Sequence, residues 1–288
     1  MKQIFIPLLA GVILSCTQSQ AQNLEFKENL SKEFTINANT GKNTLAIYNI
    51  FGPIKVKGYS GDKVVIEVNK TITADDKETL DEGKSEFKVN FEQKGDSVLA
   101  YISAPFDSRP NRNNRNWNNE KKIEYHYNLE YTVKVPFSMD LRVSTVNNGD
   151  VLVEDVAGLL HVSNVNGAIK LTNAKGAAEV KTINGNVDAN YLAVPPGDSR
   201  FKTLNGNITI IYPQSFSADC QFKSFNGEFY TDFPDAETLP VKLVKNQETN
   251  QNKTTYKVNA ETAIRIGKGG KIFKFETFNG NIYLKKQS

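Results

Sequence analysis

The sequence predicts an all-β protein: a parallel β-solenoid of short coils centred on Asn-Gly pairs, preceded by an N-terminal β-rich part. An Asn-Gly pair occurs six times, and the glycines of successive pairs are 18, 18, 21, 21 and 53 residues apart. Apolar and polar residues alternate after the pairs, which is the period of a half-buried strand. A fixed period of about 20 residues marks a unit that buries its apolar face only by stacking on its own copies.

The first 21 residues (1–21) are expected to be a secretory signal peptide. A basic start is followed by an apolar run at residues 4–14, and Ser19-Gln20-Ala21 resembles a small-residue cleavage site. The run is too short to span a membrane. A second interpretation takes the residues before Cys16 as a lipobox, with Cys16 lipidated after cleavage. Both interpretations predict export to the periplasm or outer envelope of a bacterium, and membrane contact only through a possible lipid anchor.

Residues 24–140 are expected to form the N-terminal β-rich part. Within it, residues 49–56 resemble a degenerate coil in which Phe51-Gly52 replaces the Asn-Gly pair. The best helix signal covers residues 74–88, where Asp75 or Asp76 is suited to cap the N-terminus.

Residues 107–122 form a low-complexity polar stretch, which predicts a mobile surface loop. Its residues Arg109, Arg112, Arg115 and Trp117 are suited to contact glycans, nucleic acid or anionic lipid. The surplus of asparagine favours a solvated loop without a ligand.

Residues 141–286 are expected to carry the solenoid repeats, with an insertion at residues 234–262 and a last coil at residues 274–285. Asn and Gly accept a positive φ at low cost, so each pair is expected to form a sharp corner. A small polar residue two positions before the asparagine is suited to bond backbone groups inside the corner. The corner pairs are Asn148-Gly149, Asn166-Gly167, Asn184-Gly185, Asn205-Gly206, Asn226-Gly227 and Asn279-Gly280, and the small polar residues are Asn164, Thr182, Thr203, Ser224 and Thr277.

Two architectures fit a strand, a corner and a second strand. Asn-Gly is also the strongest short hairpin signal, and an array of antiparallel hairpins would build a sandwich or barrel. The fixed period favours the solenoid, in which the corners stack in a column and the asparagines bond one another as a ladder. One continuous core is then expected from alternating apolar residues, namely Ile169, Leu171, Val187, Ile208, Ile210, Phe229 and Ile282.

No catalytic, cofactor or metal site is predicted. His126 and His161 lie in unrelated strand contexts, and no His-x-x-x-His or Cys-x-x-Cys spacing exists to hold zinc. The glycine-rich stretch 267–271 lacks the Walker spacing and is expected to be a turn. The carboxylates near the coils form no regular column, so solvated charges are preferred over a glycan-cleaving pair. These carboxylates are Asp150, Glu154, Asp155, Asp188 and Glu228, of which Asp150 and Glu228 directly follow a corner.

Several short motifs in a fixed order make the sequence resemble a known family. Residues 52–56 match an early Gly-x-Ile-x-Val unit, Val135-Pro136 matches a Val-Pro segment, and the coils match stacked Thr-apolar-Asn-Gly-x-Ile units. The chain thereby resembles the putative adhesin family of bacterial envelope proteins, which carry a β-strand-repeat domain of unknown function. The match covers most of residues 35–286. The resemblance implies a β-solenoid exported to the envelope, and it implies no catalytic residues.

Together these observations favour a non-enzymatic envelope protein that presents a stacked β surface to an unidentified glycan or protein. With 35 basic and 32 acidic residues, the balanced charge gives no reason to expect a nucleic-acid partner. Cys220 has no partner on either interpretation of the leader, so no internal disulfide is expected. Two alternatives stay open: a carbohydrate-active enzyme on a β-helix, and a periplasmic accessory or stress-sensing protein.

Overall fold

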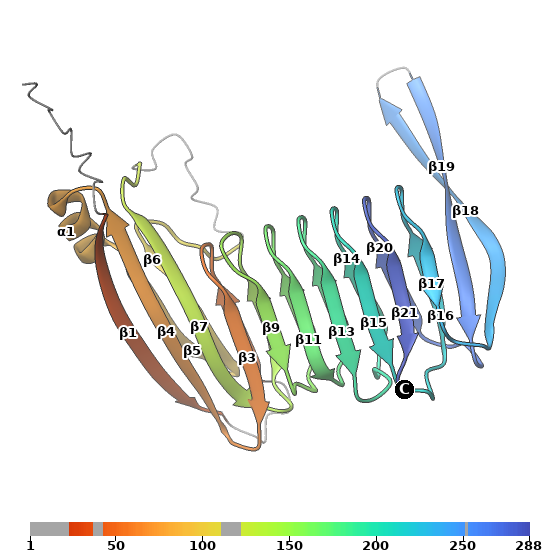
Figure 1. The fold of residues 1–288 in the computed structure, drawn as a ribbon, viewed down its shortest axis with the longest axis horizontal. Coiled ribbons are helices and arrows are strands. Elements are labelled where there is room, and N and C mark those ends of the chain that lie inside the picture. Colours follow the sequence, from red (N-terminus) through yellow and green to blue (C-terminus); the bar gives the residue numbers. More distant parts are fainter. Residues whose placement is uncertain (1–22, 37–42, 111–121, 251–252) are drawn as a thin grey trace, which may run out of the picture.

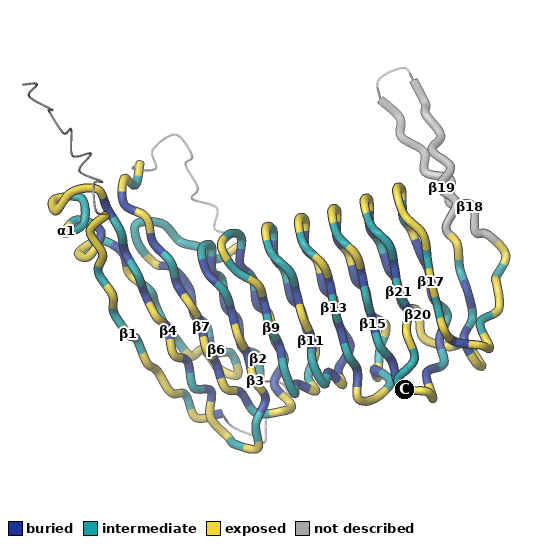
Figure 2. The backbone as a smooth tube through the Cα atoms, viewed as in Figure 1, coloured by how far each residue is buried: buried dark blue, intermediate teal, exposed yellow. Residues whose placement is uncertain are grey.

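The computed structural model describes residues 23–36, 43–110, 122–250 and 253–288, with the backbone alone described between residues 241 and 261. The expected signal peptide, Cys16, Arg112, Arg115 and Trp117 lie outside these residues. The described chain forms two large sheets, A and B, which enclose one apolar core (Figure 1). Burial alternates along the strands, so one face of each sheet is buried and the other is exposed (Figure 2). The all-β prediction is confirmed.

Sheet A is mixed and open at both edges. Its strands run in the order β1 (Leu24–Thr35), β4 (Lys63–Ala74), β7 (His126–Pro136), β3 (Ile54–Tyr59), β9 (Val151–Glu154), β11 (Ile169–Ala174), β13 (Val187–Tyr191), β15 (Ile208–Tyr212), β21 (Ile282–Lys286) and β17 (Phe229–Thr231). The long strands β1, β4 and β7 pair antiparallel, and every later pair is parallel.

Sheet B is also mixed and open. Its strands run in the order β18 (Ala236–Asn250), β19 (Lys253–Ile266), β16 (Ala218–Lys223), β20 (Ile272–Glu276), β14 (Ser199–Lys202), β12 (Ala178–Lys181), β10 (Leu160–Ser163), β8 (Asp140–Ser144), β2 (Thr44–Tyr48), β6 (Ser97–Ala104) and β5 (Lys88–Lys94). The helix α1 (Lys77–Glu86) lies beside β1 and β4 (Figure 1). As predicted, Asp76 caps it by accepting a hydrogen bond from the Thr79 amide at 2.8 Å.

The strands on either side of an Asn-Gly pair lie in different sheets and do not form a hairpin. Before Asn205, β14 pairs in parallel with β12 and β20 in sheet B. After it, β15 pairs in parallel with β13 and β21 in sheet A. We call two such strands and their corner a rung. In stacking order the rungs are β2–β3, β8–β9, β10–β11, β12–β13, β14–β15, β20–β21 and β16–β17.

The last rung in sequence is not the last rung in space. We expected residues 274–285 at the end of the column, but β20–β21 lies between β14–β15 and β16–β17. The insertion explains this order, because β18 and β19 form a hairpin and β19 pairs antiparallel with the outer side of β16. The turn at residues 267–271 then carries the chain back across the start of β16. Gly267, Gly269 and Gly270 take positive φ there, and the Lys268 amide donates to Ser217 Oγ at 3.0 Å.

Inside the corners, a small polar side chain bonds the glycine carbonyl of the neighbouring rung. Thr182 Oγ1 donates to Gly167 O at 2.9 Å, and Thr203 Oγ1 donates to Gly185 O at 2.8 Å. Both threonines are buried, so the bond gives each buried hydroxyl a partner. The same bond recurs from Asn164 to Gly149, from Thr277 to Gly206 and from Ser224 to Gly280.

The corner asparagines form a ladder of amide hydrogen bonds. Each Nδ2 donates to the Oδ1 of the asparagine on the preceding rung, as from Asn184 to Asn166 at 2.7 Å. The first member is Asn147 and not Asn148 as expected, because this corner holds one extra residue and Asn148 takes a φ of 60°. In stacking order the ladder is Asn147, Asn166, Asn184, Asn205, Asn279 and Asn226.

All six corner glycines lie where the rungs approach closely, and only three of them, Gly206, Gly227 and Gly280, also take a positive φ. A Cβ on Gly185 would lie 2.2 Å from Gly167 O, and one on Gly206 would lie 2.1 Å from Gly185 O. Gly185 and Gly167 themselves do not take positive φ. Our expectation about φ therefore holds only for some corners, and stacking at backbone contact is the more general reason for glycine.

The first residues of the expected mobile loop are docked on sheet B. Ser108 Oγ donates to Tyr48 O at 2.7 Å, and the Arg109 guanidinium lies 3.8 Å from the centre of the Tyr101 ring. Arg109 also pairs with Asp107 and Glu92. These contacts hold the start of the stretch against sheet B, while the expected mobility of the loop stays a prediction. Residues 111–121 lie outside the described residues.

Replacement of a core residue tests the inward orientation of the rungs. Ile208 on β15 is fully buried, whereas Ile211 faces outward and is half-buried. We expect Ile208→Ala to lower the free energy of unfolding by about 2–5 kcal/mol, since it leaves a cavity in the core. Ile211→Ala is the matched control and should cost far less in chemical denaturation. Equal losses at the two positions would contradict the orientation.

A glycine pair tests the close approach of the rungs. Gly185→Ala places a Cβ against the Gly167 carbonyl, whereas a Cβ on Gly197 in the opposite corner meets only Ala177 Cβ at 3.4 Å. We expect Gly185→Ala to destabilise by about 1–3 kcal/mol through overpacking. Gly197→Ala should be neutral or slightly stabilising. Thermal unfolding midpoints compare the two, and a harmless Gly185→Ala would refute the close-approach argument.

Candidate binding face

The outer face of sheet B carries the best candidate site. Strand alternation turns every second side chain outward, and the parallel register aligns these side chains in columns that cross the rungs. The first column is Arg142, His161, Glu179, Arg200, Lys274 and Gln221. The second column is Ser144, Ser163, Lys181, Lys202, Glu276 and Lys223.

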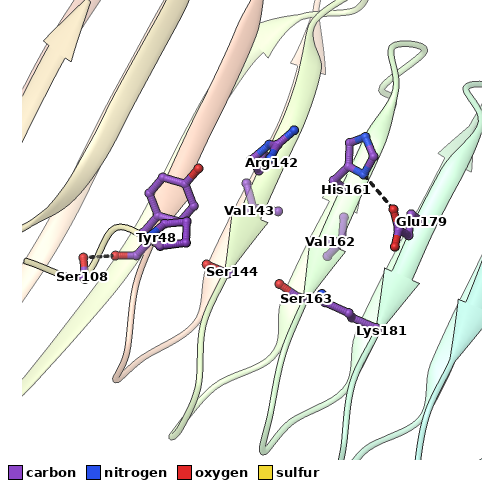
Figure 3. Close-up of a pocket in the computed structure, with 11 residues that line it drawn as sticks. Tyr48, Ser108, Arg142, Val143, Ser144, His161, Val162, Ser163, Glu179 and Lys181 are labelled. Atoms are coloured by element: carbon purple, nitrogen blue, oxygen red, sulfur yellow. Dashed lines mark hydrogen bonds and ion pairs between the residues drawn. The ribbon is translucent and has the colours of Figure 1, made fainter. Parts of the chain in front are cut away.

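Two adjoining hollows lie over these columns, and both are lined by His161 and Glu179. The first, of about 450 Å³, also contacts Tyr48, Arg142 and Ser163 (Figure 3). The second, of about 560 Å³, extends over later rungs and is lined further by Leu159, Asp198, Arg200, Ile272 and Lys274. We call the two hollows together the sheet B groove. It runs across successive rungs, from β2 to β20.

Ion pairs connect some of the side chains in the columns. His161 Nδ1 lies 3.3 Å from Glu179 Oε2, a contact visible in Figure 3. Glu276 lies between two cations, 2.5 Å from Arg200 Nη2 and 3.3 Å from Lys202 Nζ. Burial alone would raise the pKa of Glu276, but these cations outweigh burial and hold the pKa below its ordinary value.

Other cations of the face have no anionic partner. Within the described part of the chain, no ion pair engages Arg142, Lys181, Lys223 or Lys274, and all four are exposed. The aspartates of the face lie at the beginning of the strands, and Asp198 also lines the second hollow with Arg200 and Lys274. Asp140 and Asp198 accept backbone amide bonds from Leu159 and Ile272, and Asp219 pairs with Arg265. Of the four cations, Arg142, Lys181 and Lys274 line the groove.

The outer face of sheet A differs in charge. Over the same rungs, it displays two cations, Lys170 and Lys285, and two anions, Glu154 and Asp188. Burial raises the pKa of Asp188. This face therefore lacks the excess of cations found on sheet B.

A narrow apolar ridge follows the corners between the sheets. It consists of the exposed residue before the asparagine on successive rungs, namely Ile183, Leu204, Phe278 and Phe225. The Phe225 and Phe278 rings stack with centres 4.7 Å apart. The ridge offers apolar surface alone, whereas the groove combines concavity, hydroxyl groups and charge, so the groove is the stronger candidate.

The carboxylates and histidines considered as catalytic candidates in the sequence do not lie together in the structure. Asp150 accepts a backbone bond from Ala168, Glu228 bonds Tyr230, and Asp188 lies on a rung between theirs. His126 is exposed on β7, far along sheet A from the rung of His161. Glu154 pairs with Lys57, and Asp155 accepts a bond from Asn173. In the described ranges no group of three or more His, Cys, Asp or Glu side chains could hold a metal ion.

The sequence contained a signal for the groove that our interpretation did not use. An 18-residue period places residues 18 positions apart side by side, as with His161 and Glu179. Aligning the repeats on their Asn-Gly corners, which are 18 and 21 residues apart here, would have aligned the side chains of β10, β12 and β14. The place of Lys274 and Glu276 beside β14 could not be found in this way, because it depends on the inserted rung.

The position of Glu276 predicts a pH dependence of stability. A carboxyl whose pKa is lowered by folding stabilises the protein above its unfolded-state pKa, and this contribution is lost as the pH falls through the folded pKa. We expect Glu276→Gln to be less stable than the parent protein at pH 7, by less than about 1 kcal/mol because the partners are exposed. The difference should vanish well below the ordinary value of 4.5. Urea denaturation at both pH values measures it, and a pH-independent difference would contradict the assignment.

Three solved structures of proteins from bacteria are similar to this chain at low sequence identity. One is named a putative cell adhesion protein from Clostridium sporogenes ATCC 15579; it is 13% identical, covers 90% of this chain and 100% of that chain, and has a TM-score of 0.42. Another is a putative adhesin from Bacteroides fragilis NCTC 9343, 11% identical over 90% of this chain and 97% of that chain, with a TM-score of 0.36. A third is a putative lipid binding protein from Parabacteroides distasonis ATCC 8503, 9% identical with the same coverage and a TM-score of 0.30.

No curated protein sequence gives a significant match. No helix among the described residues is long and apolar enough to cross a membrane. A family model does match, over residues 110–268, which is more than half of the chain. The protein therefore belongs to the Toastrack DUF4097 family.

Proposed function

We propose that the protein is a non-enzymatic, exported protein of the bacterial cell envelope, built as a parallel β-solenoid, that binds an extended ligand in the sheet B groove. The observation that carries the proposal is the pair of adjoining hollows that crosses successive rungs. A groove along a stack of repeats offers a polymer a similar set of contacts on each rung. The ligand is a glycan or an extended protein segment of the envelope.

A binding role is favoured over catalysis by the partners of the groove side chains. His161 pairs with Glu179, but within the described residues no hydrogen bond joins it to the hydroxyl of Ser144 or Ser163. Ser144 Oγ instead donates to Ile47 O at 3.3 Å. A nucleophile needs a base within hydrogen-bond reach, and a glycosidase needs two carboxyls flanking the scissile bond. Of the carboxylates in the two columns, Glu179 lies beside His161 Nδ1 and Glu276 pairs with Arg200.

The proposal of export rests on the sequence of residues 1–21, which lie outside the described residues. Residues 1–21 combine a basic start, an apolar run and a cleavage-like site, and Cys16 offers lipidation as the other route to the envelope. Mass spectrometry of the mature chain distinguishes a start at Gln22 from a lipidated Cys16. An unprocessed chain found in the cytoplasm would contradict the proposed location in the envelope.

A bulky substitution in the groove tests the binding site. Ser163 lies in the groove on β10, and Thr172 lies on the outer face of sheet A in the same rung; both are half-buried. We expect Ser163→Trp to weaken binding roughly tenfold or more by filling the groove, whereas Thr172→Trp should leave it unchanged. Calorimetry with acidic and neutral soluble polysaccharides, and capture of proteins from envelope extract, identify the ligand class. Equal effects of the two variants on binding would show that the ligand does not bind in the groove.

The alternative of a carbohydrate-active enzyme is tested by measuring polysaccharide cleavage. Incubation of the purified protein with the same polysaccharides should release no reducing ends, because its carboxylates do not converge. Turnover that is abolished by Asp150→Asn or Glu228→Gln would replace the binding proposal with a carbohydrate-active enzyme. Capture of one envelope protein without any polysaccharide binding would favour the accessory or stress-sensing role.

A further inference from the structure

We infer that the ligand of the sheet B groove is an anionic polysaccharide, a linear chain whose carboxylate or sulfate groups recur along its length. This inference rests on the proposed function and names the ligand class of the same site. It is carried by the cations of this face, by their spacing, and by the absence among the described residues of an ion-pair partner for Arg142, Lys181, Lys223 and Lys274.

Every rung from β8 to β16 contributes a basic or histidine side chain to the two columns. Six of these side chains are lysine or arginine, and two carboxylates, Glu179 and Glu276, lie in the same columns, while Asp140, Asp198 and Asp219 lie on the same face at the beginning of the strands. The six are Arg142, Lys181, Arg200, Lys202, Lys274 and Lys223. The outer face of sheet A has two cations and two anions over the same rungs. The cations are thus a property of one face and not of the overall composition.

The spacing of the cations suits a charged polymer. Neighbouring strands of a sheet are about 4.8 Å apart, so the two columns together present a basic or histidine side chain on each successive rung from β8 to β16. One exposed ion pair contributes little, about 0–1 kcal/mol. Several pairs on one chain act together, because after the first contact the others form within the same complex. A small anion would gain only one or two of these contacts.

The cations are free to accept a ligand. Arg142, Lys181, Lys223 and Lys274 are exposed and have no ion-pair partner in the part of the chain that the structure describes. Like charges placed side by side on a sheet destabilise the fold, and a bound polyanion would relieve that repulsion. The fold thus carries an arrangement that an anionic ligand would stabilise.

The shape of the site favours a polysaccharide over other polyanions. A flat bilayer surface cannot follow the bottom of a concave groove, whereas a single sugar chain can enter it. Proteins that bind single-stranded nucleic acid stack the bases on aromatic side chains, and among the described residues that line the first hollow Tyr48 is the one Phe, Tyr or Trp. Hydroxyl groups of Ser144 and Ser163 lie among the cations and are suited to bond sugar hydroxyls.

Charge reversal in the groove provides the test. The probe is polygalacturonate, with dextran as the neutral polymer, and binding is measured by calorimetry at low and high salt. We expect Lys181→Glu/Lys274→Glu, two groove residues without an ion-pair partner among the described residues, to weaken polygalacturonate binding roughly tenfold or more. We also expect salt to weaken binding in the parent protein, because screening shortens the range of exposed charges. The control is Lys170→Glu/Lys285→Glu, which reverses the same number of charges on sheet A and should bind like the parent. Unchanged melting temperatures establish that both variants are folded.

The outcomes separate this inference from the function on which it rests. Equal losses in the two variants, or salt-independent binding, would overturn the anionic ligand. If dextran binds as tightly and Ser163→Trp blocks it, the groove is a binding site but its ligand is not selected by charge, so only this inference fails. If no polymer binds and Ser163→Trp changes nothing, both fail. Tighter binding to duplex DNA or to vesicles of anionic lipid than to polygalacturonate would also overturn it.

Discussion

The hydrogen bond from a buried corner side chain to the glycine carbonyl of the neighbouring rung is the interaction on which the structure depends. The donor is a hydroxyl or amide on one rung, as at Thr203, and the acceptor is the glycine carbonyl of the preceding rung, as at Gly185. The carbonyl is accessible only because glycine lets the backbones approach. Since both partners recur at the same place in each repeat, one local rule fixes the register of the whole stack.

A fixed register turns single residues into columns. The corner asparagine two positions after each polar residue bonds the asparagine of the neighbouring rung, and these bonds form an exposed ladder. The same register places Phe201, Phe275 and Phe222 in one stacked row inside the core. On the outer face of sheet B it aligns the lysines and arginines, so a side chain that alone would be an unremarkable surface charge becomes part of a groove.

The sequence allowed the fold class, the corners and the core to be predicted, because each depends on residues within one repeat. Six of the seven core residues we expected, Ile208 among them, are buried, and Phe229 is half-buried near the edge strand β17. That Asn147 and not Asn148 joins the ladder could not be predicted. One extra residue in this corner moves the ladder position to Asn147 but leaves the Asn148-Gly149 pair in the sequence unchanged. The docking of Arg109 on Tyr101 depends on a contact between two segments with no repeat signal.

The position of the last rung joins the fold to the candidate site. Because β20 lies between β14 and β16, Glu276 lies beside both Arg200 and Lys202, and Lys274 extends the row of cations. Stacking in sequence order would instead place β16 next to β14, and Lys223 would lie beside Lys202 with no carboxylate between them. The long β18–β19 hairpin and the glycine turn that follows it make the observed order possible. A segment that interrupts the repeats in sequence therefore helps to set the charge pattern of the groove.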